Sequence, residues 1–175
     1  MKLLFTALVR LHLEYGNLVW HPQLKKDMQL LESVQHRASR MVPGLSKLSY
    51  EERLQKLGIP SLTYRRLRGD AIEVYKYLHG MYSAESEDIL SLHLDNGHTT
   101  RGHNFKLQKR PCKSQLRANF FGIRVVNVWN SLPVEVVTAD SVNCLKGRFD
   151  RLYGRMCHRE VWDDSEWEFG YAGKH

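Results

Sequence analysis

The residues with the strongest chemical bias lie in one stretch of the chain that contains no acid. Between Asn96 and Val134 there is no Asp or Glu, although basic residues recur and phenylalanines are interleaved with them. Lys and Arg contacts to phosphate supply most of the affinity in non-specific nucleic-acid binding, and exposed aromatic rings can stack on bases. The stretch therefore predicts a nucleic-acid-binding surface. Its candidate residues are Arg101, Lys106, Lys109, Arg110, Lys113, Arg117 and Arg124, with Phe105, Phe120 and Phe121 among them. The alternative is a solvated basic face in which Phe120 and Phe121 are buried.

A second basic cluster consists of Arg65, Arg66 and Arg68, which open an expected helix. These three arginines are further candidates for contact with nucleic acid. The alternative is that Arg65 or Arg66 forms an ion pair with an acid nearby in the chain, and the available acids are Glu51, Glu52 and Asp70.

One aspartate pair, Asp163 and Asp164, has a superficial likeness to a polymerase metal site. Phosphoryl transfer by two Mg²⁺ ions needs clustered carboxylates. The pair lies in an acidic tail with no strand pattern around it, and no third aspartate precedes it in a matching context. We therefore predict no catalytic residue in this chain.

Metal binding and cysteine chemistry are not indicated either. His93, His98 and His103 recur every five residues, and Cys157 precedes His158, but neither spacing matches a zinc motif. No Gly-rich phosphate loop is present, so we expect no cofactor. The three cysteines are widely spaced and odd in number, which argues against a disulfide framework and favours a reducing compartment.

Composition indicates a folded chain with a positive field. The 175 residues are 42% hydrophobic and carry a formal net charge of +7, a balance that favours polyanionic partners. The N-terminal apolar run is interrupted by charge, and no run of about 18 apolar residues exists. We expect an intracellular protein, nuclear or cytoplasmic, that is neither secreted nor inserted in a membrane.

The stretch from Leu31 to Gly80 must provide the frame. Apolar residues at steps of three and four predict a first helix there, followed by a break at Pro43 and Gly44. Ser49 and Glu52 form a capping-box pattern for a second helix, which Gly58 ends. Ser61 can cap a third helix. The predicted inward residues are Met28, Leu31, Val34, Ala38 and Met41 in the first, Leu54 and Leu57 in the second, and Leu67, Ala71, Val74, Tyr75 and Leu78 in the third.

Similar periodicity predicts helices on both sides of this frame. One spans the N-terminal residues up to Gly16, one covers residues 83–94, one runs from Leu116 to Leu132, and a last one is capped by Ser141. The predicted apolar stripes are Leu4, Leu8, Leu11 and Tyr15, widened by Phe5 and Val9; Phe121, Val125, Val128 and Leu132 with Trp129; and Val142, Leu145, Phe149 and Leu152.

These elements predict a mainly α fold, a helical bundle with a basic extended arm or short hairpin near residues 99–113. The predicted organisation is a helical unit over residues 1–94, the arm with C-terminal helices over 95–159, and an acidic tail over 160–175.

Five ordered segments have a specific resemblance. The segments LEYGNLVW, LESVQHRASRMV, LSYEERLQKLGIPSLTYRRLRGDAIEVYKYLHG, TRGHNFKL and FFGIRVVNVWNSLP resemble, in this order, the region after the palm in reverse transcriptases of jockey-like non-LTR retrotransposons. The resemblance covers about residues 3 to 152. One departure is Arg10-Leu11-His12, where the family usually has Arg-Pro-His, and it should make the first helix more continuous.

The resemblance implies a thumb-like region that grips a template-primer duplex, separated here from the catalytic palm and the endonuclease. The implied partners are DNA or an RNA–DNA hybrid, bound without sequence preference, and a polymerase palm supplied by another chain. The chain would not be an enzyme on its own. The alternative is a helical protein-interaction module, or an inert transposon remnant, in which the apolar stripes merely pack together.

Overall fold

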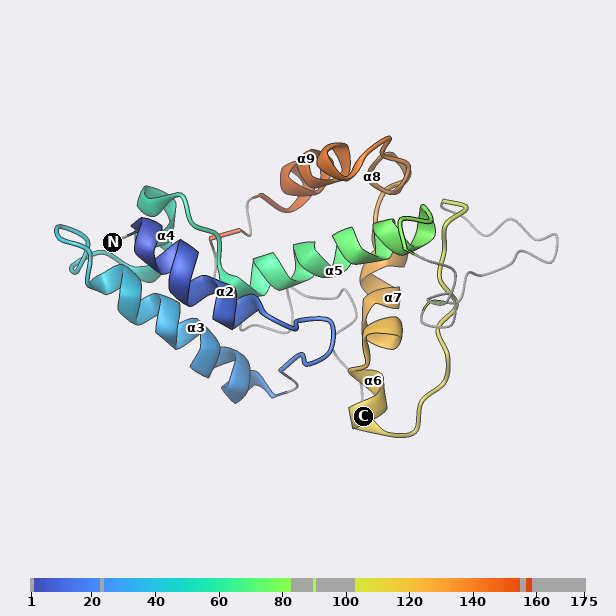
Figure 1. Ribbon diagram of the computed structural model, residues 1–175, viewed down its shortest axis with the longest axis horizontal. Helices are drawn as coiled ribbons and strands as arrows, with labels where there is room; N and C mark the ends of the chain where they lie inside the picture. The colour runs from blue at the N-terminus through green and yellow to red at the C-terminus, as the bar shows by residue number, and fades with distance from the viewer. Residues whose placement is uncertain (1, 23, 83–89, 91–102, 155–156, 159–175) are drawn as a thin grey trace. The chain divides into compact units, whose positions relative to one another are not determined.

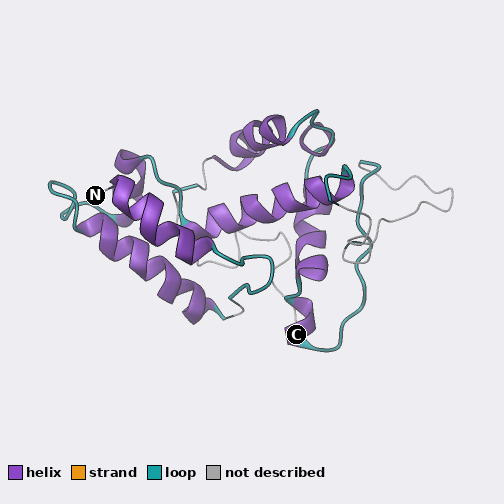
Figure 2. Ribbon diagram, in the orientation of Figure 1, coloured by secondary structure: helices purple, strands orange, loops and turns teal. Residues whose placement is uncertain are grey.

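The computed structural model describes residues 2–22, 24–82, 90, 103–154 and 157–158 (Figure 1). The fold is mainly helical, as predicted, and no strand occurs among these residues (Figure 2). Within the same ranges, every helix is too short or too polar to cross a membrane. The predicted helix over residues 83–94 and the acidic tail lie outside the described residues, apart from Leu90.

The helices follow one another in this order: α1 (Lys2–Leu4), the π-helical turn η1 (Phe5–Val9), α2 (Arg10–Glu14), α3 (Lys25–Arg40), α4 (Tyr50–Leu57), α5 (Leu62–Leu78), α6 (Gln115–Ala118), α7 (Phe121–Ser131), α8 (Val134–Val137) and α9 (Val142–Tyr153).

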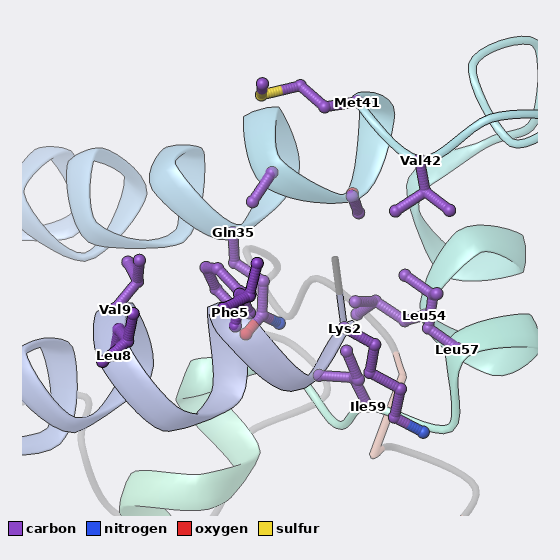
Figure 3. Close-up of a pocket in the computed structure, with 13 residues that line it drawn as sticks. Lys2, Phe5, Leu8, Val9, Gln35, Met41, Val42, Leu54, Leu57 and Ile59 are labelled. Carbon is purple, nitrogen blue, oxygen red and sulfur yellow. The ribbon is translucent and has the colours of Figure 1, made fainter.

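The chain divides into two compact units, and the division falls within α5. Among the described residues, the N-terminal unit contains 2–67 and 153–158, and the C-terminal unit contains 68–152. The boundary predicted between residues 94 and 95 falls outside the described part of the chain. Each unit has its own apolar interior, and that of the N-terminal unit includes the cluster of Tyr50, Leu54 and Ile59 with Leu57 packed against it. Leu54, Leu57 and Ile59 also line an apolar pocket (Figure 3).

The helix ends of the N-terminal unit confirm the predicted caps. The Glu52 amide donates to Ser49 Oγ, and Glu52 Oε2 accepts from the Ser49 amide at 2.8 Å, which completes the capping box. The Ser49 amide and the Ser49 hydroxyl both donate to the Glu52 carboxylate, and these two hydrogen bonds lower the pKa of that carboxyl. Gly58 ends α4 with φ +58°, a left-handed conformation that glycine adopts without a steric penalty. Ser61 Oγ accepts from the Tyr64 amide at the start of α5.

The predicted inward stripe of α3 is wrong in part, since Met28, Leu31 and Ala38 are only half-buried. The buried residues of α3 are Glu32, Gln35 and Ser39, whereas Val34 and Met41 are exposed. The reason is a polar interior: both Glu32 carboxylate oxygens accept from the Leu62 amide, at 3.2 and 3.0 Å, and one also accepts from the Tyr50 hydroxyl. An anion at a helix N-terminus satisfies an amide that has no intrahelical partner.

The apolar stripe of the first helix is mostly exposed. Helical turns continue from Lys2 through η1 to Glu14, and Gly16 follows with φ +67°. Leu4, Leu8, Leu11 and Tyr15 are exposed, the last to 80%, and so is Val9. Phe5 is the stripe residue that is buried.

The C-terminal unit has the apolar core that the sequence predicts. Its buried residues include Ala71, Val74 and Tyr75 from α5, Phe121, Val125, Val128 and Trp129 from α7, and Leu145 and Phe149 from α9. The helix predicted from Leu116 to Leu132 is instead divided, because Phe120 has extended dihedrals and precedes α7 as its N-cap. Ser141 caps α9 as expected, with the Cys144 amide donating to its Oγ. Leu152, the last residue of the predicted stripe, is exposed, so this part of the prediction is wrong.

Candidate nucleic-acid interface

The basic arm comprises residues 103–114, which run without helix from His103 to the start of α6 (Figure 1). Asn130 of α7 holds it by two hydrogen bonds: the Leu107 amide donates to Asn130 Oδ1 at 2.8 Å, and Asn130 Nδ2 donates to the Leu107 carbonyl at 2.9 Å. Trp129 Nε1 donates to the Phe105 carbonyl at 2.8 Å. The side chains of α7 thus satisfy backbone groups of the arm. Residues 103–113 contain no helix, with a turn at 104–105 and an isolated β-bridge residue at Leu107, and residues 99–102 lie outside the described part of the chain.

The first half of the basic arm faces α7 and α5. His103 is buried, with Nε2 3.4 Å from the Trp129 carbonyl, so Nε2 carries the proton. Burial lowers the pKa of His103 and the nearby charge of Lys106 lowers it further, while the bond to Trp129 opposes both. The Phe105 ring stacks on His79 of α5, with centroids 5.5 Å apart. The neutral imidazole and the aromatic ring fix this half in place.

The second half of the basic arm, together with α6, presents the exposed cations. Lys109, Arg110 and Lys113 are exposed in the arm, and Arg117 is exposed on α6. Within the described residues, Lys109, Lys113 and Arg117 have no ion-pair partner. Phe120 is 55% exposed, directly after α6. Four cations within nine residues, followed by an accessible aromatic ring, form the candidate interface.

Burial removes one predicted residue from this surface. Arg124 is only 4% exposed, and its guanidinium pairs with Asp70 of α5, with Nη2 2.8 Å from Oδ1. It also lies over the Phe121 ring, 5.4 Å from the centroid. The prediction that Arg124 contacts nucleic acid is therefore wrong, because its guanidinium is buried in an ion pair with Asp70. Lys106 is half-buried, and Arg101 lies outside the described residues.

The arginines at the start of α5 are also engaged within the protein. Arg65 forms a two-point ion pair with Glu14, and Arg68 forms one with Asp150, at 2.6 and 2.8 Å. Arg66 is buried and donates to the Leu13 carbonyl. The cluster has the alternative role that its sequence allowed, although the acids that pair with it are not those nearest in the chain. It is not part of the candidate interface.

Sequence reasoning missed the residues that position the basic arm. Asn130 is not among the predicted residues, yet its amide supplies both a donor and an acceptor to Leu107 of the arm. Its place beside Trp129 at the end of an apolar helix was the only local signal. The exposure of Phe120 was left open, and it follows from the break between α6 and α7.

The described residues hold no group of three or more His, Cys, Asp or Glu side chains placed to bind a metal ion. Cys157 Sγ lies 3.1 Å from His158 Nδ1, but two groups do not complete a zinc site. His93, His98, Asp163 and Asp164 lie outside the described residues. Comparison with protein-family models, curated proteins and solved structures gives no significant match for this chain.

Proposed function

We propose that this chain binds duplex or RNA–DNA hybrid nucleic acid without reading its sequence, through the exposed part of the basic arm and α6. The observation that carries the proposal is the exposure of Lys109, Arg110, Lys113 and Arg117 in an acid-free segment anchored to α7. The resemblance of the sequence to the region after the palm in non-LTR retrotransposon reverse transcriptases supports the same function.

The type of side chain accounts for the expected lack of sequence preference. Lysine and arginine contacts to phosphate fix the position of a protein on nucleic acid but carry no base information. The arm has no helix or strand that would enter a groove and present side chains to base edges. Phe120 can stack on an accessible base at a strand end or in a single-stranded segment, which is also insensitive to sequence.

We further propose that the chain is a binding region rather than an enzyme by itself, and that a polymerase palm on another chain would supply the chemistry. Template-dependent nucleotide incorporation by the isolated chain, with Mg²⁺ or Mn²⁺, should not exceed that of a denatured control. Incorporation that disappears when Asp163 and Asp164 are both changed to Ala would contradict this proposal.

The salt dependence of binding tests the interface directly. If the four exposed cations each contact phosphate on B-DNA, log K against log[salt] should have a slope of about −3.6, at about −0.9 per contact. Fluorescence anisotropy with labelled duplexes of different sequence between about 50 and 200 mM salt measures this slope. Undetectable or salt-independent binding would exclude the proposed function.

Charge reversal tests which cations act. Changing Lys109, Arg110 and Lys113 together to Glu should flatten the slope and weaken binding to every duplex alike. The matched control changes Lys25, Lys26 and Lys47 to Glu, because these lysines are equally exposed but lie outside the basic arm. Asn130→Ala keeps every charge while removing both hydrogen bonds to Leu107, so it should weaken binding less than the reversal.

A second function is favoured by a different observation. The exposed stripe of Leu4, Leu8, Leu11 and Tyr15 on the first helix is the kind of apolar face that a protein partner covers. A helical interaction module would use this face and would tolerate charge reversal in the basic arm. Loss of nucleic-acid binding on that reversal would favour the first function over the second.

A further inference from the structure

Three exposed cations of the candidate interface have no anion beside them in the described part of the chain. Lys109, Lys113 and Arg117 form no ion pair there. The cause lies in the sequence, because residues 97–133 include no Asp or Glu. An anion of the same chain that neutralises these cations must therefore come from another segment.

The acidic tail is the segment whose composition best complements these cations. Five of the 19 acidic residues of the chain lie within residues 160–168, and no Lys or Arg occurs between Arg159 and Lys174. At full extension nine residues span about 30 Å, so these acids provide about one negative charge per 6 Å, compared with about one per 3.4 Å along a DNA strand. Trp162 and Trp167 are interleaved with the acids. The tail thus offers carboxylates to the cations and flat rings to the exposed ring after α6, as a nucleic acid offers phosphates and bases.

We propose that the acidic tail binds the exposed cations of the basic arm and α6, and so competes with nucleic acid for them. This inference rests on the proposed function, since it assigns a competitor to the same cations. A single exposed ion pair contributes little, but several act together here, and the tail is tethered to the protein that carries the cations.

The tether sets the strength of the competition. A segment on a short linker has an effective concentration of about 1 mM, and non-specific binding of nucleic acid is characterised by a dissociation constant of up to about 10⁻⁴ M. A tail that binds at this weak limit would occupy the cations about ten times as often as it leaves them available. The apparent affinity for nucleic acid falls by the fraction of molecules in which the cations are available.

Neutralising the tail tests this competition in the full chain. The tail variant changes four acids to amides: Asp163→Asn, Asp164→Asn, Glu166→Gln and Glu168→Gln. It should bind a labelled duplex about tenfold more tightly than the unaltered chain, because the tail no longer occupies the cations. Fluorescence anisotropy at about 0.1 M salt measures the difference.

The control variant changes the same number of Asp and Glu residues in the other acidic stretch: Glu85→Gln, Glu87→Gln, Asp88→Asn and Asp95→Asn. It raises the net charge by the same amount, so it should reproduce only the small effect of overall charge, which salt screens. Equal affinities of the unaltered chain and the tail variant, or equal effects of the two variants, would overturn the proposal.

A peptide of residues 160–175 tests the contact without nucleic acid. Added to the tail variant of the full chain, it should shift the NMR amide signals of residues 109–117, whereas the peptide with the same four amides should not. Absence of these shifts would contradict the proposed contact. If no variant binds duplex, the proposed function fails, and the peptide titration alone decides whether the tail binds the arm. If the unaltered chain and the tail variant bind duplex equally, the proposed function stands and this inference fails.

Discussion

Among the described residues, the N-terminal unit buries more polar side chains than the C-terminal unit, although both have an apolar core. The C-terminal unit surrounds Trp129, which is 1% exposed, with apolar side chains, and its buried charges pair with each other as Asp70 and Arg124. The N-terminal unit buries Glu32 and Gln35 while it exposes Leu11 to 63%. The first arrangement is held mainly by the transfer of apolar surface from water, and the second depends more on satisfied polar groups at helix ends.

Apolar residues at helical spacing therefore do not always identify the buried face of a helix in this chain. On α5 and α7 the apolar stripe identifies the core. On the first helix and on α3 several apolar residues are exposed, and on α3 specific hydrogen bonds hold Glu32 and Gln35 inside. Substitutions in the two units should therefore respond to different properties of the side chain.

The largest effect is expected at Trp129. Trp129→Ala should lower the free energy of unfolding by about 3–5 kcal/mol, because it empties the core of the C-terminal unit. It also removes the donor to the Phe105 carbonyl. Chemical denaturation measures the loss. Trp20→Ala is the matched control, since Trp20 is substantially exposed and should cost far less.

A smaller loss in the free energy of unfolding is expected at Glu32, whose substitution tests the buried polar groups of the N-terminal unit. Glu32→Leu should destabilise the protein by about 1.5–3 kcal/mol, the range for hydrogen bonds to a charged group, although it makes the interior more apolar. Val34→Ala, two residues away on the exposed side of α3, should change the free energy of unfolding by less than about 0.5 kcal/mol. Stabilisation by Leu at position 32 would show that this interior is not held by its polar groups.

The caps allow a finer comparison. Ser49→Ala should cost about 1 kcal/mol, because it removes the hydroxyl that accepts from the Glu52 amide. Ser33→Ala is the control, because the Ser33 hydroxyl donates to a carbonyl within α3 and caps no helix. Equal, negligible losses at the two serines in denaturant titrations would mean that the capping box contributes little to the N-terminal unit.

The smallest effect concerns pH and the C-terminal unit. Because the folded-state pKa of His103 is below its ordinary value near 6.5, the unfolded chain binds a proton at a pH where the folded chain does not. The contribution of His103 is complete above about pH 6.5 and is lost as the pH falls towards the lowered pKa. His103→Gln should make unfolding less pH-dependent in this window. The comparison must be with the unaltered chain, since burial also lowers the pKa of His158.

Local patterns predicted those parts of the fold that depend on neighbours in the sequence. The Ser49 cap, the Gly58 end and the α5 stripe each require only residues within a few positions. Glu32 and Gln35 could not be placed in this way, because their partners at Leu62 and Pro60 are 30 and 25 residues away. A polar stripe on a helix normally faces solvent, and nothing within α3 indicates otherwise.

The same limit applies to the candidate interface. Composition identified a basic, acid-free stretch, but it could not distinguish exposed cations from paired ones. Arg124 is removed from the surface by Asp70, 54 residues earlier, and Arg68 pairs with Asp150, 82 residues later. Lys109 and Lys113 differ from these arginines only in having no described acid beside them, which becomes visible once the helices are packed.

Because Asn130 holds the basic arm at Leu107, the stability of the fold should not depend on the length of the arm after that residue. Both bonds use the Leu107 backbone, so they require no particular side chain there and sense nothing beyond that residue. Insertions or replacements between residues 108 and 114 would leave the attachment point unchanged. A graft of foreign sequence at this position would inherit a defined starting point on α7, whereas a single-residue deletion between His103 and Leu107 would shift every contact of the arm by one place.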